Sequence, residues 1–505
     1  MYRNFGITKE EDPFDIILSA VNKLVDFAKP TYGPSNNNIL VKRFDKVQAA
    51  DDGAIISEEF HLKDPKEQQV LDFVRSANRS TNALVGDGNI TTMLILQGIL
   101  NEYDKTRYSL WRRKKQKDIV EEIKSASKDA IQQLKDSAKD ISTIDSIRDV
   151  ARISFNNSEI ASMVADIVFK IGKEGVVYIE ETSSVQTTYA IMAGMEFDRG
   201  FVSHYMATDD NLEMATFHNP VILITDQRIT SMKQIAPWIV ACKQNERELV
   251  VVCDSIDGDA LEFIIENKVK GICKTLAIQA PELGERKSDF LKDVCVITGA
   301  ELLSQDKDLT KVDLALLGQA EKIVSLSDKT TIIGGKGDKD KLDQRVKALQ
   351  SKLEVEDSGW EKDRLKKEIA SLLGGVAVIR IGAPTEAELK SLVPKIRNSV
   401  NSAQSAYKDG VVKGAALSLY EIETGSKLFD SVLKIPHKVL LDNCEEILVK
   451  YESNEAKNYS TGYIGEFVQA GVIDPVKVVC TAIENAVSVA LLLLKNRGII
   501  DSSNK

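Results

Sequence analysis

The chain is poor in the side chains that build metal centres and disulfide frameworks. Its 505 residues include six cysteines, none of them in a C-x-x-C pair, and only four histidines. Zinc sites need clusters of these residues, and a disulfide framework needs paired cysteines. We therefore expect no cysteine-histidine metal cluster, and free buried thiols in a reducing compartment.

The chain also has few long apolar runs. Its first residues, MYRNFGITKEEDPFD, contain no apolar segment of the kind found in signal peptides. The most apolar stretch, residues 476–494, is interrupted by Lys477, Glu484 and Asn485, which indicates a buried helix rather than a membrane span. A cytoplasmic protein without a membrane partner is expected.

An excess of positive charge is missing as well. Acidic residues number 76 and basic residues 66, which gives a net charge of −10. Nucleic-acid-binding proteins usually carry a basic face. The one strongly basic run, WRRKKQK at residues 111–117, is more simply a solvated helix start or loop. We expect no nucleic-acid partner.

Two widespread phosphate-binding motifs are absent from the sequence. It contains no G-x-x-x-x-G-K-[ST] motif, and no G-x-G-x-x-G follows a predicted strand. A metabolic kinase or ligase, or another phosphate-transfer enzyme of these classes, is therefore only a remote alternative.

A different glycine-rich turn is present at residues 86–92 (GDGNITT), followed by the apolar run 93–96. Glycine allows the backbone to approach a ligand closely, and the first amides of a helix favour phosphate. The Asp87 carboxylate repels phosphate but suits Mg²⁺, which bridges phosphates through oxygen ligands. Taken alone, such a triplet is more simply an ordinary turn with Asp87 as a local cap.

The turn belongs to an ordered series of short motifs. The others are residues 31–34 (TYGP), 51–53 (DDG), 174–177 (EGVV), 197–200 (FDRG), 374–379 (GGVAVI), 410–414 (GVVKG) and 473–475 (IDP). The series resembles the GroEL-type (group I) chaperonins from about residue 14 to residue 496. Identity is patchy, so the chain looks like a divergent member.

The length of the sequence and the changes in its predicted secondary structure indicate several domains. Apolar residues recur at helical spacing in residues 14–29 and 118–138, and short strand-like runs alternate with helices from about residue 190. The resemblance implies a multidomain GroEL-like chaperonin fold. It consists of a mostly helical equatorial domain (1–137 and 409–505), a small mixed α/β intermediate domain (138–192 and 376–408) and an α/β apical, client-binding domain (193–375).

Three glycines lie between these domains. We expect hinges at Gly194, Gly374 and Gly375. The alternative is that these glycines only end strands and helices.

The resemblance implies ATP and Mg²⁺ as ligands, with Asp87 as the magnesium ligand. The residues that match the family's nucleotide pocket are Thr31, Tyr32, Gly33, Pro34, Asp51, Gly53, Gly86, Asp87, Gly88, Asn89, Ile90, Thr91, Gly414, Ala415, Asn458 and Asp474. The match at Asn458 is loose. Asp474 and Pro475 also suit the cap and first turn of the last long helix.

Several pocket positions depart from the family pattern. Asn89 and Ile90 stand where the family has threonines, Asp51 replaces a lysine, and Ala415 follows Gly414 where the family has glycine. Backbone contacts survive such changes, whereas hydroxyl and lysine contacts do not. We therefore expect weaker binding of the nucleotide.

The most important departure concerns catalysis. The family carries an aspartate that activates or orients the attacking water, and the matching residue here is Asn398. An amide cannot act as a general base. Asp52 is retained and could still orient water, so Asp52 and Asn398 are the candidate catalytic residues. Whether the chain is a useful ATPase is left open, and we expect slow hydrolysis.

A chaperonin holds non-native proteins on exposed apolar surface, which folded monomers normally avoid. Eight residues match the family's client-binding positions: Phe201, Tyr205, Met206, Ala236, Ile239, Leu261, Ile265 and Glu266. The alternative is that the apolar residues near Leu261 are only the core side of one helix. Ala236 is small and Glu266 is charged, which puts docking of a cochaperonin lid in doubt.

Two functions follow from the resemblance. The first is an ATP-driven chaperone whose identical subunits form a heptameric ring, single or double, that binds unfolded or partly folded proteins and assists their refolding. The second is an ATP-independent holdase with the same fold. The altered pocket favours the second, and the retained Asp52 and Asp87 favour the first.

Overall fold

The computed structural model describes residues 12–34, 37–43, 46–50, 53–85, 87–107, 115–155, 157–209, 211, 213–449, 451–452, 454–496 and 498–499. The chain forms two compact units. We call residues 1–166 and 394–505 the split unit, because two separate parts of the chain build it, and residues 167–393 the central unit. The expected three-domain boundaries stay a prediction.

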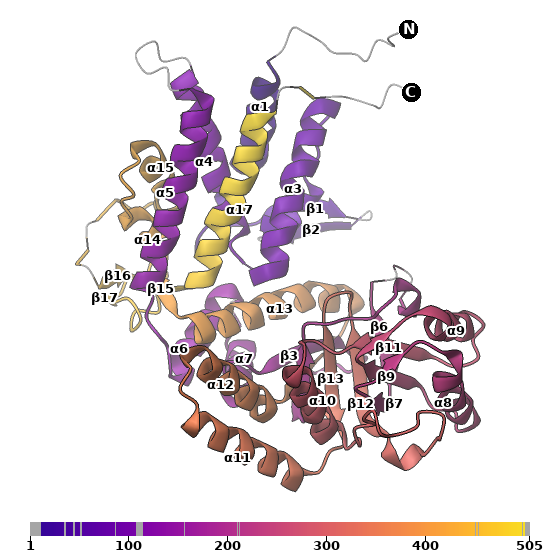
Figure 1. The fold of residues 1–505 in the computed structure, drawn as a ribbon. Coiled ribbons are helices and arrows are strands. Elements are labelled where there is room, and N and C mark those ends of the chain that lie inside the picture. The colour runs from indigo at the N-terminus through magenta and orange to yellow at the C-terminus, as the bar shows by residue number, and fades with distance from the viewer. Residues whose placement is uncertain are drawn as a thin grey trace, which may run out of the picture. The chain divides into compact units, whose positions relative to one another are not determined.

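Long helices form the core of the split unit (Figure 1). They are α1 (Pro13–Ala28), α3 (Pro65–Val85), α4 (Asn89–Arg107), α5 (Gln116–Ser137) and α17 (Val476–Lys495). The last helix packs against α3, α4 and α5, so segments from both ends of the chain share one core. By length and hydropathy α17 could cross a membrane, but 67% of its apolar window is buried inside the structure, as in a core helix.

Further helices and three strand pairs accompany these helices. The helices are the 3₁₀ turn η1 (Lys29–Thr31), α2 (Gly53–Glu59), α6 (Ile144–Ser154), α7 (Ser158–Ile171), α13 (Glu386–Asp409), α14 (Leu417–Glu421), α15 (Lys427–Leu433) and α16 (Ile435–Asn443). The strands form three antiparallel pairs: β1 (Ile39–Arg43) with β2 (Lys46–Ala50), β15 (Val411–Lys413) with β18 (Ile473–Pro475), and β16 (Glu455–Lys457) with β17 (Ile464–Glu466). Helices α7 and α13 each contain a boundary between the two units.

The pairing of β15 with β18 corrects one expectation about the last helix. Asp474 pairs with Val412 inside β18, and α17 begins only at Val476. The Asp474 side chain makes no capping hydrogen bond to α17. It is therefore available to the pocket described below.

The central unit contains a seven-stranded mixed sheet with the order β11-β9-β7-β12-β13-β5, and β6 also pairs with β12. Its strands are β5 (Gly194–Phe197), β6 (Ala215–His218), β7 (Val221–Ile224), β9 (Leu249–Cys253), β11 (Thr275–Gln279), β12 (Gly318–Ser325) and β13 (Thr330–Gly335). The parallel strands β7, β9 and β11 are almost wholly buried, which explains why they are continuous apolar runs.

Helices and a short strand pair accompany this sheet. They are the 3₁₀ turn η2 (His204–Met206), α8 (Met232–Gln244), α9 (Gly258–Val269), α10 (Glu285–Thr298) and the 3₁₀ turn η3 (Leu314–Leu316), with β8 (Arg228–Ile229) paired to β10 (Ser255–Ile256). Helices α8 and α9 pack against each other, and Trp238 of α8 is completely buried. The expected α/β region is therefore confirmed.

A second sheet joins distant segments of the chain. Its strands are β3 (Val176–Glu181), β14 (Val376–Ile381) and β4 (Thr188–Met192), in the order β3-β14-β4. The helical pair α11 (Lys339–Val355) and α12 (Gly359–Gly374) precedes β14.

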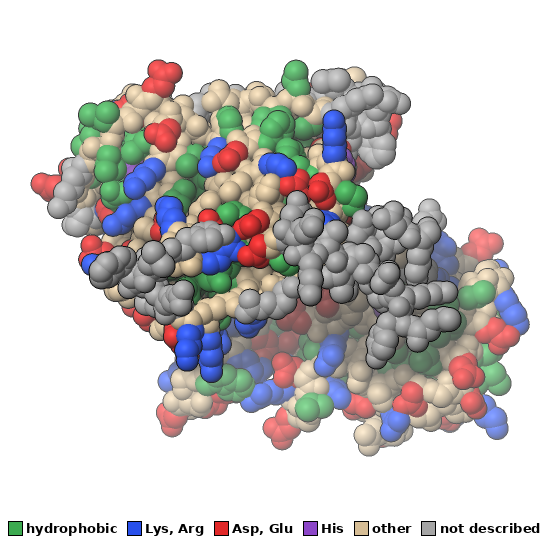
Figure 2. Space-filling model, turned by 90° about the horizontal axis from the view of Figure 1, so that it is seen from above, with side chains coloured by type: hydrophobic (Ala, Val, Ile, Leu, Met, Phe, Trp, Pro, Cys, Tyr) green, Lys and Arg blue, Asp and Glu red, His purple; other side chains and the backbone are tan. Residues whose placement is uncertain are grey.

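On the face of the molecule in Figure 2, acidic and basic side chains of the described residues are interspersed.

The three candidate hinge glycines are needed for close backbone packing. A Cβ atom on Gly194 would lie 2.2 Å from the Ile332 carbonyl oxygen, and one on Gly374 would lie 2.5 Å from that of Ile171. Gly375 has a φ of 64°, a conformation that other residues rarely adopt. Packing thus accounts for these glycines, and their role as hinges stays a prediction.

Candidate functional site

Helix α16 supports the first loop of the predicted nucleotide pocket. The Asn443 side-chain amide donates to the carbonyl oxygens of Lys29 and Tyr32, at 2.7 and 2.8 Å. Gly33 has a φ of 101°, and a Cβ there would lie 3.2 Å from a side-chain carbon of Leu440. Two residues of α16 therefore fix the backbone that leads into Pro34.

A second loop places Asp87 at the start of α4. One Asp87 oxygen accepts from the Gly88 N–H at 2.6 Å, and the other accepts from the Ser154 hydroxyl at 3.2 Å. Gly88 has a φ of 83°, and a Cβ there would lie 3.0 Å from Val478. The Asp87 side chain is thus held by its own turn and by the last residue of α6.

Asp87 and Asp474 are two half-buried acidic groups that interact with each other. Burial raises the pKa of Asp87, although the Gly88 and Ser154 hydrogen bonds oppose the shift. Burial and the negative charge of Asp87 raise the pKa of Asp474 to about 7. Among the described residues, no lysine or arginine offsets these two carboxylates.

The beginning of α4 forms one side of the predicted nucleotide pocket. The Tyr32 hydroxyl and the Thr91 hydroxyl are 3.1 Å apart and form a hydrogen bond. Burial and the two nearby aspartates raise the pKa of Tyr32, so it stays neutral. Ile90 packs against Gly53, where a Cβ would lie 2.5 Å from its side chain. The structure thus joins the loops that carry Tyr32, Gly53 and Thr91.

The loop after β15 lies close to β18. A Cβ on Gly414 would lie 2.7 Å from the Ile473 nitrogen, so only glycine fits. Ala415 and Ala416 both have a φ of 54°, in the left-handed region that favours glycine. The Ala416 N–H is directed to the Asp474 carboxylate and lowers its pKa against the effect of burial. The substituted glycine of the family is therefore a strained alanine here.

These residues fit a magnesium-bound nucleotide. A divalent cation takes oxygen ligands and would relieve the repulsion between Asp87 and Asp474. The first amides of α4 suit an anion such as phosphate. Asp51, Asp52 and Gly86, which were also predicted for this pocket, lie outside the described residues. Among those that are described, no group of three or more histidine, cysteine or acidic side chains forms a metal site.

Asn398 lies on α13, on a helix that packs near this pocket. The neighbouring Ser399 donates its hydroxyl to the Ala151 carbonyl oxygen of α6, at 2.9 Å. One turn further along α6, Ser154 contacts Asp87. Helix α6 therefore connects the segment of Asn398 to the pocket.

The side chain of Asn458 is occupied by hydrogen bonds within its own segment, and its place in the pocket stays a prediction. Its side-chain amide donates to the Ala470 carbonyl oxygen at 2.9 Å, and its side-chain oxygen accepts from the amides of Ser460 and Thr461. Asn458 thus shapes its own turn next to β16. Any contact with a nucleotide would come from this turn as a whole.

The predicted client-binding residues divide into two sets. Phe201, Met206 and Ile239 are buried, with at most 7% of each exposed, and belong to the core of the central unit. This corrects the expectation of surface exposure, because helical spacing alone cannot tell which face of α8 is covered. Tyr205 is 62% exposed, and Glu266 is exposed and paired with Lys270 at 2.5 Å.

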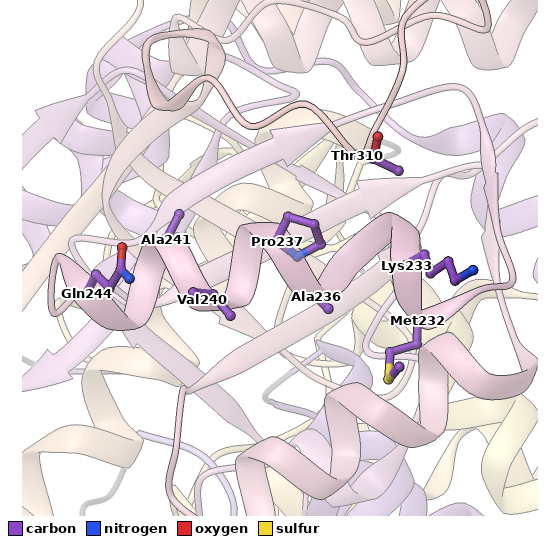
Figure 3. Close-up of a pocket in the computed structure, with 8 residues that line it drawn as sticks. All are labelled: Met232, Lys233, Ala236, Pro237, Val240, Ala241, Gln244 and Thr310. Atoms are coloured by element: carbon purple, nitrogen blue, oxygen red, sulfur yellow. The ribbon is translucent and has the colours of Figure 1, made fainter.

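Helix α8 offers an apolar groove that the sequence reading only partly identified. The groove has a volume of about 670 Å³. Met232, Ala236 and Val240 follow one face of the helix at intervals of four residues, as Figure 3 shows. Met232 and Val240 are 45% and 53% exposed. The remaining lining residues are Lys233, Pro237, Ala241, Gln244 and Thr310. Leu261 and Ile265 of α9 are half-buried against the core.

The family model of the TCP-1/cpn60 chaperonins matches residues 24–504. This chain belongs to that family. The resemblance to GroEL-type chaperonins and the predicted multidomain chaperonin fold are thereby confirmed, and the protein is a divergent chaperonin of this type.

Solved structures agree with this assignment. Two crystal structures of the chaperonin gp146 from the bacteriophage EL 2 (Pseudomonas aeruginosa), both in the presence of ATP-BeFx, are similar to this chain. The first has a TM-score of 0.73, covering 98% of both chains, and the second has 0.66, covering 100% of both. Identity is 16% in each case, so the likeness shows the fold alone.

The sequence analysis of this chaperonin missed residues that support the pocket loops. Asn443 and His437 contact backbone carbonyl oxygens of two loops, and Ser154 donates to the Asp87 carboxylate in the third. A polar residue within an apolar helix stretch is the only signal that such a residue gives in a single sequence. Met232 and Val240 could have been found from their four-residue spacing with Ala236.

Proposed function

We propose that this chaperonin binds ATP with Mg²⁺ in the pocket around Asp87 and Asp474, and that it binds non-native proteins and assists their refolding. The observation behind the nucleotide part is the pair of carboxylates beside the first amides of α4, which no lysine or arginine of the described residues offsets. The presence of ATP-BeFx in crystals of the similar phage chaperonin supports the same ligand class.

In the proposed pocket, each residue has a limited task. Asp87 would hold the magnesium ion, and Gly88, Asn89 and Thr91 would lie along the phosphates. Gly414, Ala415 and Asp474 would face the ribose. The bound ATP would supply a phosphoryl group for transfer to water.

We propose that this hydrolysis is slow. Asn398 is neutral and cannot take a proton from water. Loss of a general base typically lowers a rate by about 10²–10⁴-fold. Asp52 is the retained acid that could still orient water. The strained Ala415 and Ala416 add a second departure from the family pattern in the same pocket.

We also propose the surface that binds clients. Met232, Ala236 and Val240 of α8 expose apolar side chains next to a groove, and Tyr205 is exposed on η2. Such a patch binds unfolded chains through apolar contacts that do not depend on sequence. Leu261, Ile265 and Glu266 of α9 stay in the proposal. Phe201, Met206 and Ile239 are removed from it, because they are buried.

The assembly in this proposal is a homo-oligomeric heptameric ring in the cytoplasm. Nucleotide can shift the domains only through a difference in affinity between two conformations. A pocket that binds nucleotide weakly therefore supplies little free energy for the conformational change. When ATP is scarce, we expect the behaviour of the second candidate, an ATP-independent holdase with the same fold.

The test combines native mass with client capture. The purified chain is weighed by native mass spectrometry and then mixed with a chemically denatured client, with and without Mg²⁺-ATP. We expect a ring, suppression of client aggregation, and slow refolding of the client only with ATP. Capture without ATP-dependent refolding would support the holdase. A monomer that leaves aggregation unchanged would contradict both.

A further inference from the structure

A buried histidine lies behind the proposed ribose side of the pocket. His437 of α16 is 0% exposed. Its Nδ1 is 2.8 Å from the carbonyl oxygen of Ala415. Since a carbonyl oxygen only accepts, Nδ1 carries the hydrogen and donates it. The ring also packs edge-on against Tyr420, with centroids 5.3 Å apart.

The carbonyl group that His437 contacts belongs to a loop that packs against β18. A Cβ on Gly414 would lie 2.7 Å from the Ile473 nitrogen, and Val412, just before this loop, pairs with Asp474. The carbonyl oxygen of Ala415 accepts from His437. The histidine therefore acts on a turn that lies directly beside the strand of Asp474.

The peptide of this carbonyl group lies between two residues in an unfavourable conformation. Ala415 and Ala416 both have a φ of 54°. A left-handed alanine is strained, and such a conformation persists only where the surroundings enforce it. The flanking backbone is held independently, since the Gly414 N–H donates to Val472 and the Tyr420 N–H to Ala416. The contact with His437 fixes the orientation of the peptide between them.

The other ring nitrogen of His437 argues against a role in core packing alone. Nε2 is buried and has no hydrogen-bond partner among the described residues. A buried polar atom without a partner destabilises the folded state, because it gives up its hydrogen bonds to water. Burial lowers the pKa of His437, which keeps the ring neutral. An apolar side chain would avoid the unpaired nitrogen, so the benefit of histidine lies in Nδ1.

We propose that His437 is a positioning residue of the nucleotide pocket: its Nδ1–H holds the carbonyl group of Ala415 and thereby fixes the turn at Ala415 and Ala416. The inference rests on the proposed nucleotide pocket and goes beyond it, because His437 touches neither ligand. Without this donor the peptide can rotate toward less strained conformations. The turn then loses its fixed position beside β18.

The test uses two substitutions that separate the donor from the packing. His437→Phe keeps an aromatic ring against Tyr420 but removes the donor. His437→Asn is smaller and keeps an N–H close to the position of Nδ1. Ile123→Ala, in the core at α5, serves as a control for general destabilisation of the split unit.

Two measurements are made on the intact protein. Hydrogen exchange without nucleotide reports the loop: we expect residues 414–420 to exchange at least about tenfold faster in His437→Phe and near the native rate in His437→Asn and Ile123→Ala. Calorimetric titration with Mg²⁺-ADP reports the pocket: we expect affinity to fall about tenfold or more in His437→Phe and less than about threefold in the other two.

The outcomes distinguish this inference from the proposed function. Unchanged loop exchange in His437→Phe overturns the positioning role, whether or not the protein binds nucleotide. Faster exchange with unchanged ADP affinity overturns its importance for the pocket. If the native protein binds no ADP, the proposed nucleotide function fails, and the inference falls with it even where exchange shows that His437 orders the loop.

Discussion

The two proposed sites of this chaperonin differ in what builds them. The nucleotide pocket is built mostly by backbone: glycines at 33, 88 and 414 permit close approaches, and buried side chains hold the loops from behind. The client surface is built by side chains on one face of α8. A pocket made of backbone tolerates substitutions, such as Asn89 and Ile90, that would abolish a site made of side-chain contacts.

The comparison also shows where each site is vulnerable. In the pocket, the few functional side chains are half-buried carboxylates, so a single change of charge should have a large effect. On the client surface, apolar contacts are shared among several residues, so single changes should have moderate effects. The experiments below test this difference, beginning with the largest expected effect.

Substitution of Asp87 should have the largest effect on binding. Asp87→Asn keeps the shape of the side chain but removes the charge that would hold Mg²⁺. We expect the Mg²⁺-dependent affinity for ADP to fall by at least about 100-fold, measured by calorimetric titration. The matched control is Asp145→Asn, an exposed aspartate of α6, which should bind like the native protein. Equal affinity of both variants would contradict the assignment of Asp87.

Charged substitutions on α8 should weaken client capture without unfolding the protein. Met232→Glu and Val240→Glu place a carboxylate in the apolar groove, and we expect the pair to reduce capture of a denatured client about tenfold. Light scattering of the aggregating client measures the effect. Lys243→Glu, an exposed charge change on the same helix, is the control that should retain capture.

A substitution on the buried side of α8 should lower stability and leave client capture unchanged. Ile239→Ala removes a core side chain and should lower the free energy of unfolding by about 2–5 kcal/mol. Client capture below the unfolding temperature should be unchanged. A strong loss of capture with little change in thermal stability would return Ile239 to the client surface.

The smallest expected effect is a pH-dependent change in stability at Asp474. Its folded-state pKa of about 7 lies above the ordinary value of 3.8, so its contribution to stability is full below pH 4 and is lost as the pH rises through 7. In the metal-free protein with EDTA, Asp474→Asn should therefore be more stable than the native chain above pH 7, by about 1–3 kcal/mol.

Thermal unfolding from pH 5 to pH 8 measures this difference. It should grow with pH and level off above the folded-state pKa of Asp474. The same variant should bind Mg²⁺-ADP more weakly, since the charge that destabilises the empty pocket serves the ligand. A pH-independent difference would contradict the burial of this carboxylate.

Much of the fold could be predicted from the sequence, because its signals are local. The apolar runs at 221–224, 249–252 and 275–278 and the amphipathic helix at 118–138 all appear near their expected positions. The family motifs placed Tyr32, Asp87 and Asp474 in one group, and the structure brings these three together.

Other features could not be predicted, since they depend on tertiary contacts. Helical periodicity shows that α8 has an apolar side, but not that both sides carry apolar residues or that Met232 and Val240 are its exposed large apolar side chains. It does not show that Asp474 lies in a strand pair instead of capping α17. The contacts of Asn443 and His437 join segments far apart in the chain, which a single sequence does not reveal.

The central claim is that the pocket retains its binding residues but has lost the group that activates water. The most direct test is phosphate release with Mg²⁺-ATP from the native protein and from Asn398→Asp, measured side by side at equal ATP occupancy. The account predicts slow release from the native protein and a rate at least about tenfold higher in Asn398→Asp. Rapid release from the native protein that Asn398→Asp does not increase would contradict it.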